Sequence, residues 1–282
     1  MTSEGSSITQ LSVATDQQST NSGANVPGST SATPATPVTS PPRSTAVRIM
    51  ALGDSLTAGD DPSNPAKAQS YRGYLESSLQ AAGYKVDFVG SMKQPAIGGN
   101  DPDHEGHGGF SIGPDNAKLC AKDQTCPPAN LDSGLAGWLK EADPDVVVLL
   151  AGVNDLFDED GGVYRPTVPE QADDKLKALV ARIRALQPDA RIVVGSYPPI
   201  SFLITGSDEK VFADLNAAAK SAGSGTDKQV VYAPLREKLD GNWTDADVVS
   251  TSDQVHPRDT GAKKIAAVFY EAMVPVLDAL GR

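Results

Sequence analysis

Residues 145–155 read Asp-Val-Val-Val-Leu-Leu-Ala-Gly-Val-Asn-Asp, an apolar run that ends in a turn with two polar residues. The five consecutive apolar residues at 146–150 leave no polar face, which is typical of a strand covered on both sides. Such strands occur in parallel sheets that are packed by helices on both faces. The stretch therefore predicts an α/β fold.

The segments on either side repeat this alternation of strand and helix. Short apolar runs predict strands at 47–52, 86–89, 145–151, 191–195 and 229–232. Apolar residues at helical spacing predict helices at 71–82, 131–142, 172–186, 210–222 and 260–280. The pattern predicts one doubly wound α/β domain over residues 46–282, with about five parallel strands and helices on both faces.

The first 45 residues differ in composition from the rest of the chain. They are rich in Ser, Thr, Pro, Gly and Ala and show no periodicity. Such a segment cannot bury enough apolar surface to offset its ordering entropy, so we predict a disordered linker or tail. Residues 1–4 lack the basic start of a signal peptide, which leaves a trimmed secreted form or an intracellular protein. The linker favours a secreted protein that was tethered to a second module on its N-terminal side.

The charge balance excludes several classes of partner. The 282 residues include 24 Lys and Arg against 36 Asp and Glu, a formal net charge of −12. This charge repels phosphate backbones and anionic bilayers, so neither nucleic-acid binding nor a membrane-surface role is expected. The sequence also lacks a run of about 18 apolar residues that would predict a membrane span.

The metal-binding residue types do not occur at ligand spacing. Cys120 and Cys126 can close a small disulfide loop in an oxidising compartment, which we favour over two free thiols. The His-Glu-x-His spacing at 104–107 is one residue short of the zinc-binding His-Glu-x-x-His. The acidic run at 158–160 lacks the spacing of an EF-hand calcium loop, so a solvated loop is favoured. We expect no metal at these residues, and the family resemblance given below implies that no organic cofactor is needed.

Ligands of doubly wound sheets bind beyond the carboxyl ends of the strands, and reactive residue types occur there. Ser55 lies in Gly53-Asp54-Ser55-Leu56, after the first strand, where it can act as a nucleophile or simply cap a helix. His256 follows Asp253 by three residues, so the aspartate can orient the imidazole as a base for Ser55. An exposed turn with an aspartate cap is the alternative.

Two further strand ends carry groups that can stabilise a negative charge. Asn154, which follows the strand at 145–151, can donate its side-chain amide to a developing oxyanion, or it can be an ordinary turn residue. Gly106, Gly108 and Gly109 allow the backbone near them to approach a ligand closely. The histidines and acidic residues among these glycines either brace the loop or line the rim of a pocket.

Four blocks in this order resemble the GDSL, or SGNH, hydrolase superfamily. They are Gly53-Asp54-Ser55-Leu56, a glycine after the second strand, Gly152-x-Asn154-Asp155 and Asp253-x-x-His256-Pro257. Tyr71-Arg72, Asp87-Phe88-Val89-Gly90-Ser91 and Asp103-His104-Glu105-Gly106-His107-x-Gly109 are similar to the carbohydrate esterase family 3 acetylxylan esterases. Gly108 departs from that subfamily, which has Ser there.

The resemblance implies a flavodoxin-like SGNH hydrolase fold and a role for each matching residue. Ser55 would attack an ester carbonyl, His256 would act as the base, and Asp253 would orient the imidazole. The backbone N–H groups of Ser55 and Gly109 and the side chain of Asn154 would bind the oxyanion. The other aspartates in these motifs, Asp54 and Asp155, would only brace the loops.

The expected function is that of a serine esterase that removes acetyl groups from a plant-wall polysaccharide, with acetylated xylan favoured. A lysophospholipase or thioesterase of the same superfamily is one alternative, and a glycan-binding module without turnover is another. The presence of all the expected reactive residues argues against the binding module without turnover. Four residues are candidates for substrate binding: Tyr71, Arg72, His107 and Phe110. Two more aromatic residues, Tyr197 and Trp243, can also stack on a sugar, although packing is favoured for every aromatic candidate.

Overall fold

A computed structural model describes residues 45–59, 69–113, 130–156, 169–199, 207–249 and 255–281. Several predictions concern residues outside these ranges and stay predictions. They are the linker before residue 45, the Cys120–Cys126 disulfide, the acidic loop at 158–160 and the orienting role of Asp253.

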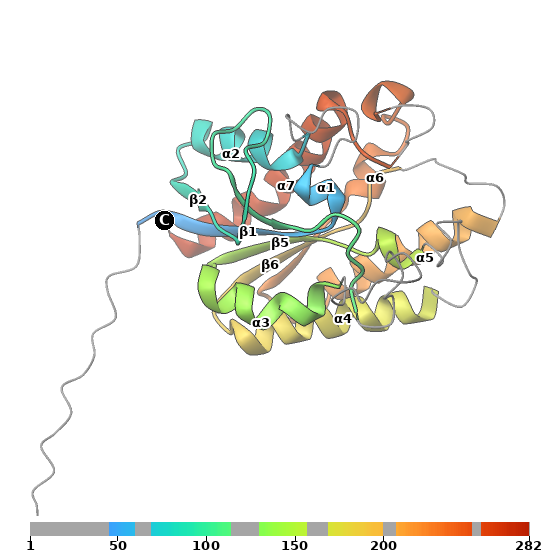
Figure 1. The fold of residues 1–282 in the computed structure, drawn as a ribbon, viewed down its shortest axis with the longest axis horizontal. Helices are drawn as coiled ribbons and strands as arrows, with labels where there is room; N and C mark the ends of the chain where they lie inside the picture. Colours follow the sequence, from blue (N-terminus) through green and yellow to red (C-terminus); the bar gives the residue numbers. More distant parts are fainter. Residues whose placement is uncertain are drawn as a thin grey trace, which may run out of the picture. The chain divides into compact units, whose positions relative to one another are not determined.

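The centre of the fold is a mostly parallel sheet (Figure 1). Its seven described strands are β1 (Val47–Gly53), β2 (Val86–Phe88), β3 (Met92–Lys93), β4 (Asp103–Gly106), β5 (Val146–Leu150), β6 (Arg191–Gly195) and β7 (Val230–Ala233). Their order is β3-β4-β1-β5-β6-β7, and β2 also pairs with β1. Every pairing is parallel except the one between β3 and β4. The predicted α/β class is confirmed, and β3 and β4 are additional strands.

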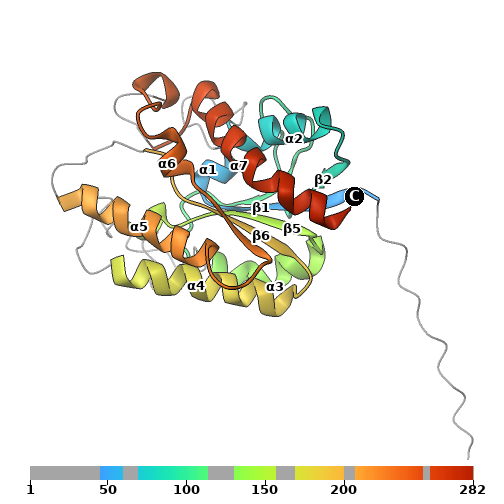
Figure 2. The same ribbon diagram turned by 180° about the vertical axis from the view of Figure 1, so that it is seen from behind.

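Helices cover both faces of the sheet (Figures 1 and 2). They are α1 (Ser55–Ala58), α2 (Tyr71–Ala81), α3 (Leu131–Ala142), α4 (Pro169–Leu186), α5 (Ser207–Gly223), α6 (Leu235–Leu239) and α7 (Asp259–Leu280), with 3₁₀ turns η1 (Val153–Leu156) and η2 (Asp245–Asp247). The helices α2 and α7 lie on one face, and α3 and α4 lie on the other. None of the helices described is both long and apolar enough to cross a membrane.

The central strand β5 shows why its sequence has no polar position. Val146, Val148 and Leu150 belong to the core that includes α2 and α7. Val147 and Leu149 belong to the core on the other face, with α3 and α4. Successive strand side chains point to opposite faces, so a strand between two helical layers needs apolar residues at every position.

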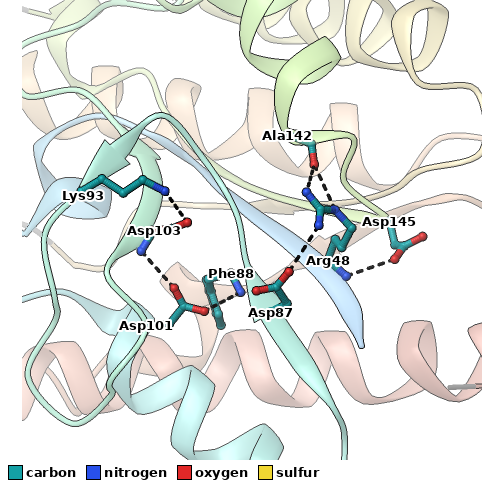
Figure 3. Close-up of polar contacts among 8 residues, drawn as sticks. All are labelled: Arg48, Asp87, Phe88, Lys93, Asp101, Asp103, Ala142 and Asp145. Atoms are coloured by element: carbon teal, nitrogen blue, oxygen red, sulfur yellow. Dashed lines mark hydrogen bonds and ion pairs between the residues drawn. The ribbon is translucent and has the colours of Figure 1, made fainter. Parts of the chain in front are cut away.

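Polar contacts brace the end of the sheet where β1 begins (Figure 3). The guanidinium of Arg48 donates two hydrogen bonds to the carbonyl oxygen of Ala142, at 3.2 and 2.8 Å, and pairs with Asp87 at 3.4 Å. The backbone N–H of Arg48 donates to the carboxylate of Asp145 at 3.0 Å. Four segments are thus joined at the start of β1, whereas Ser55 follows the opposite end of that strand.

Candidate active site

Ser55 lies on a sharp turn between β1 and the short helix α1. Gly53 is required at the end of β1, because a Cβ atom there would lie 2.1 Å from the carbonyl oxygen of Leu150. Asp54 then caps α1 by accepting a hydrogen bond from the Leu56 N–H at 3.0 Å. Ser55 is the first residue of α1, so its own N–H has no acceptor within the helix. The turn therefore presents both a hydroxyl and a backbone donor.

His256 reaches this turn from the loop before α7. Its Nε2 atom lies 2.9 Å from the Oγ of Ser55, although 201 residues separate the two in the sequence. This distance suits transfer of the hydroxyl proton to the imidazole. The structure thus brings together two of the three residues expected to form the triad, while Asp253 lies outside the described residues.

The candidate oxyanion donors Gly109 and Asn154 meet at a second turn, formed by residues 107–110. Gly109 is part of this turn, and Asn154 is hydrogen-bonded to it. The N–H of His107 donates to the carbonyl oxygen of Gly53 at 2.8 Å, which fixes the turn against the end of β1. Gly109 lies inside the turn with φ of +77°, a conformation that glycine adopts without strain. The side-chain amide of Asn154 donates to the carbonyl oxygen of Phe110 at 2.9 Å. Both candidates therefore lie at the sheet edge that carries Ser55.

The side chain of His107 braces this turn through contacts with Glu105, Phe110 and Trp138. Its Nε2 atom lies 2.7 Å from the carboxylate of Glu105, which is fully buried and also accepts two 2.7 Å hydrogen bonds from Ser91. The imidazole stacks between Phe110 and Trp138, with ring centroids 4.8 and 4.3 Å away. His107 thus takes the bracing role that the sequence offered as the alternative to substrate binding.

Two other candidates for substrate binding prove to be interior residues. Tyr71 has no exposed surface, packs on Phe269 and lies with its hydroxyl 3.2 Å from the Oγ1 of Thr57. Arg72 is 2% exposed and donates to the carbonyl oxygens of Thr57 and Ala58, at the end of α1. The prediction that Tyr71 and Arg72 bind substrate is therefore wrong, because both side chains serve to hold α1. Phe110 is half-buried and remains a candidate.

Two buried titratable groups near the site have displaced pKa values. Burial raises the pKa of Asp54 to about 6, against the opposing effects of hydrogen bonds from Tyr197 and Leu56 and of the charge on His256. Burial lowers the pKa of His104 to about 3, so this imidazole is neutral at ordinary pH. The sequence predicted that Asp54 braces the loop and that Tyr197 packs or, less favoured, stacks on a sugar. It did not show that the two side chains meet, because nothing in the motif links them.

His104, in β4, and His107, just after it, do not form the zinc motif that their spacing resembles. His104 and Glu105 are neighbours in a strand, so their side chains point to opposite faces. The Nδ1 atom of His104 accepts a hydrogen bond from the N–H of Gly106 at 3.0 Å. Within the described ranges, no three His, Cys, Asp or Glu side chains converge as metal ligands would.

Comparison with known proteins identifies the family. Residues 51–264 match the model of the GDSL-like lipase/acylhydrolase family. A family 3 carbohydrate esterase from Clostridium thermocellum is 26% identical, with a TM-score of 0.63 over 84% of this chain and 99% of that one. A search of curated proteins finds no match.

More distant structures share the fold. A family 3 carbohydrate esterase from Talaromyces cellulolyticus is 23% identical, with a TM-score of 0.58 over 83% of this chain and 99% of that one. A lipase/acylhydrolase from Enterococcus faecalis is 16% identical, with a TM-score of 0.52 over 80% and 95%. Together with the family match, these similarities show that the chain belongs to the GDSL-like lipase/acylhydrolase family and has the SGNH hydrolase fold.

Proposed function

We propose that this protein is a serine esterase that removes O-acetyl groups from a plant cell-wall polysaccharide, with acetylated xylan as its substrate. The observation that carries the proposal is the 2.9 Å distance between the Oγ of Ser55 and the Nε2 of His256. A serine hydroxyl within hydrogen-bond reach of an imidazole is the arrangement that activates serine for acyl transfer.

The proposed reaction has two acyl-transfer steps. His256 accepts the hydroxyl proton as the Oγ of Ser55 attacks the acetyl carbonyl carbon, and Asp253 orients the imidazole. The resulting oxyanion accepts hydrogen bonds from the N–H groups of Ser55 and Gly109 and from the amide of Asn154. His256 then returns the proton to the leaving sugar oxygen, which leaves an acetyl group on Ser55. Water, activated by the same imidazole, releases acetate and restores the serine.

Three observations support an acetylated glycan as substrate. The solved structure that shares 26% identity with this chain is a family 3 carbohydrate esterase. Aromatic residues make up only 5% of the sequence, which does not favour a large lipid-binding tunnel. Phe110, in the turn at residues 107–110, is half-buried, so part of the residue is exposed to solvent. The Ser, Thr and Pro-rich composition of residues 1–45 supports action outside the cell.

The test is acetate release from acetylated xylan by the wild type and by Ser55→Ala. An exposed serine far from the site, Ser224, provides the matched control Ser224→Ala. The proposal expects release by the wild type and by Ser224→Ala, with loss in Ser55→Ala. Ser55-dependent hydrolysis of aryl octanoate faster than aryl acetate, without acetate release from xylan, would instead indicate a lipid esterase or thioesterase. Xylan binding without hydrolysis of any ester would indicate a binding module.

A further inference from the structure

A buried carboxylate and a buried phenol lie beneath the candidate nucleophile. Asp54 is 0% exposed and Tyr197 is 1% exposed. The Tyr197 hydroxyl donates a hydrogen bond to the Oδ2 of Asp54. The same hydroxyl oxygen accepts a hydrogen bond from the N–H of Val153 at 3.1 Å. One phenol therefore bridges two separate segments of the chain.

The two bridged segments are the ones that carry the proposed chemistry. Asp54 directly precedes Ser55, and Val153 directly precedes Asn154. The bridge is itself anchored, because the N–H of Tyr197 donates to the Oδ1 of Asn216, in α5, at 2.7 Å. Tyr197 thus sets the position of the Ser55 turn relative to the Asn154 turn.

Helix capping does not explain why residue 54 is an acid. Asparagine caps a helix as well as aspartate does, without the cost of burying a charge. Among the described residues, no lysine or arginine forms an ion pair with Asp54. The charge of Asp54 therefore needs another explanation.

Several titratable side chains interact electrostatically with the carboxyl of Asp54, and they indicate which group its negative charge affects. Electrostatic interactions connect its carboxyl with Tyr71 of α2, Asp155 of η1 and His256 of the loop before α7, in addition to Tyr197. Asp155 is paired with Lys175 of α4 at 3.3 Å. His256 is the one member of this group that becomes a cation during acyl transfer.

We propose, on the basis of the esterase function above, that Tyr197 and Asp54 are positioning residues for the reaction. The phenol holds the Ser55 turn and the Asn154 turn in register. It also favours the ionised form of Asp54, whose negative charge stabilises His256 as it takes up the proton.

The proposal has a consequence for the pH dependence of the reaction. Burial raises the pKa of Asp54 to about 6, and the hydrogen bond from Tyr197 opposes that increase. Removal of the phenol oxygen therefore raises the pKa of Asp54 further. If the reaction needs ionised Asp54, the acidic limb of the kcat/KM profile against pH must move to higher pH in Tyr197→Phe.

The test compares Tyr197→Phe with Tyr84→Phe in steady-state kinetics on aryl acetate between pH 5 and 8. Tyr84 is the matched control, because its hydroxyl also donates to a carboxylate, that of Asp278, at 2.6 Å on the surface. We expect kcat of Tyr197→Phe to fall about tenfold with KM changed less than about threefold, since the lost bond organises the reacting groups. The acidic limb of kcat/KM should move to higher pH in Tyr197→Phe and stay in place in Tyr84→Phe.

A second variant separates positioning from general loss of structure. Asp54→Asn removes the titrating group, so adding Tyr197→Phe to it should cause no further shift of the acidic limb. An unmoved limb in Tyr197→Phe, or equal kinetics of Tyr197→Phe and wild type, would overturn the proposal while leaving the esterase function intact. Absence of ester hydrolysis in the wild type would overturn the esterase function itself. Thermal unfolding of each variant shows that the protein assayed is folded.

Discussion

The side-chain amide of Asn154 donates a hydrogen bond to the carbonyl oxygen of Phe110, 2.9 Å away. This bond uses one amide hydrogen and leaves the second for a ligand. Phe110 also closes the turn around Gly109, because its N–H donates to the carbonyl oxygen of His107 at 3.2 Å. Two proposed oxyanion donors are therefore held by one set of hydrogen bonds.

Replacement of the Asn154 amide tests this arrangement. We expect Asn154→Ala to lower kcat on aryl acetate about 10² to 10³-fold, or about 3–4 kcal/mol of barrier, with little change in KM. Asn242→Ala is the control, because Asn242 is exposed and lies outside the site. A kcat of Asn154→Ala within about threefold of wild type would remove Asn154 from the oxyanion hole.

Gly109 and Gly241 form a matched pair with nearly the same backbone conformation. Their φ angles are +77° and +73°, so an alanine at either position costs about 1–2 kcal/mol of strain. We expect Gly109→Ala and Gly241→Ala to lower the free energy of unfolding by similar amounts, measured in urea. Only Gly109→Ala should also lower kcat, because a strained turn displaces the Gly109 N–H. Equal activity of the two variants would contradict a role for that N–H.

Asp54 should make folding less favourable as pH rises through the mildly acidic range. Its pKa is about 6 in the folded protein and about 3.9 in the unfolded chain, so the folded state retains a proton that the unfolded state has lost. The stabilisation is present below about pH 4 and is lost by about pH 7, which amounts to about 3 kcal/mol. We therefore expect the unfolding free energy of Asp54→Asn, relative to wild type, to increase from pH 4 to pH 7.5. A constant difference over this range would show that the Asp54 carboxyl is not desolvated.

His104 should have the opposite effect on stability. Its pKa is about 3 when folded and about 6.5 when unfolded, so the unfolded state binds a proton that the folded state does not. Stability is then complete above about pH 6.5 and falls as pH decreases, by about 3 kcal/mol at pH 4. His104→Asn keeps an acceptor for the Gly106 N–H and removes the titration. Urea unfolding should show a smaller loss of stability between pH 7 and pH 4 in this variant than in wild type.

The sequence predicted the strands that lie in apolar runs, and it missed the short β3 and the polar β4. The runs at 47–52 and 145–151 correspond to β1 and β5. Burial on both faces requires apolar residues along the whole strand, and this requirement is visible in the sequence. Asp103–Gly106 forms β4, although Asp and Gly are unfavourable in strands. Pairing of Glu105 with Leu52 of β1, and buried partners for the Glu105 carboxylate, provide the stabilisation. Such partners come from distant segments and leave no local signal.

The site was predicted unevenly for a similar reason. Motif order along the strand ends correctly placed Ser55 and His256 at one edge of the sheet. Helical spacing did not show that Tyr71 points into the core, since an aromatic residue at the start of a helix fits either environment. The link between Tyr197 and Asp54 spans 143 residues, and only the folded chain shows it.

The most direct test of the central claim, that Ser55 is a nucleophile activated by His256, is covalent labelling with a fluorophosphonate followed by peptide mass spectrometry. We predict a single label on Ser55, loss of esterase activity in proportion to labelling, and labelling slowed at least about a hundredfold in His256→Ala. Full activity after labelling, a label on another residue, or undiminished labelling of His256→Ala would contradict the account.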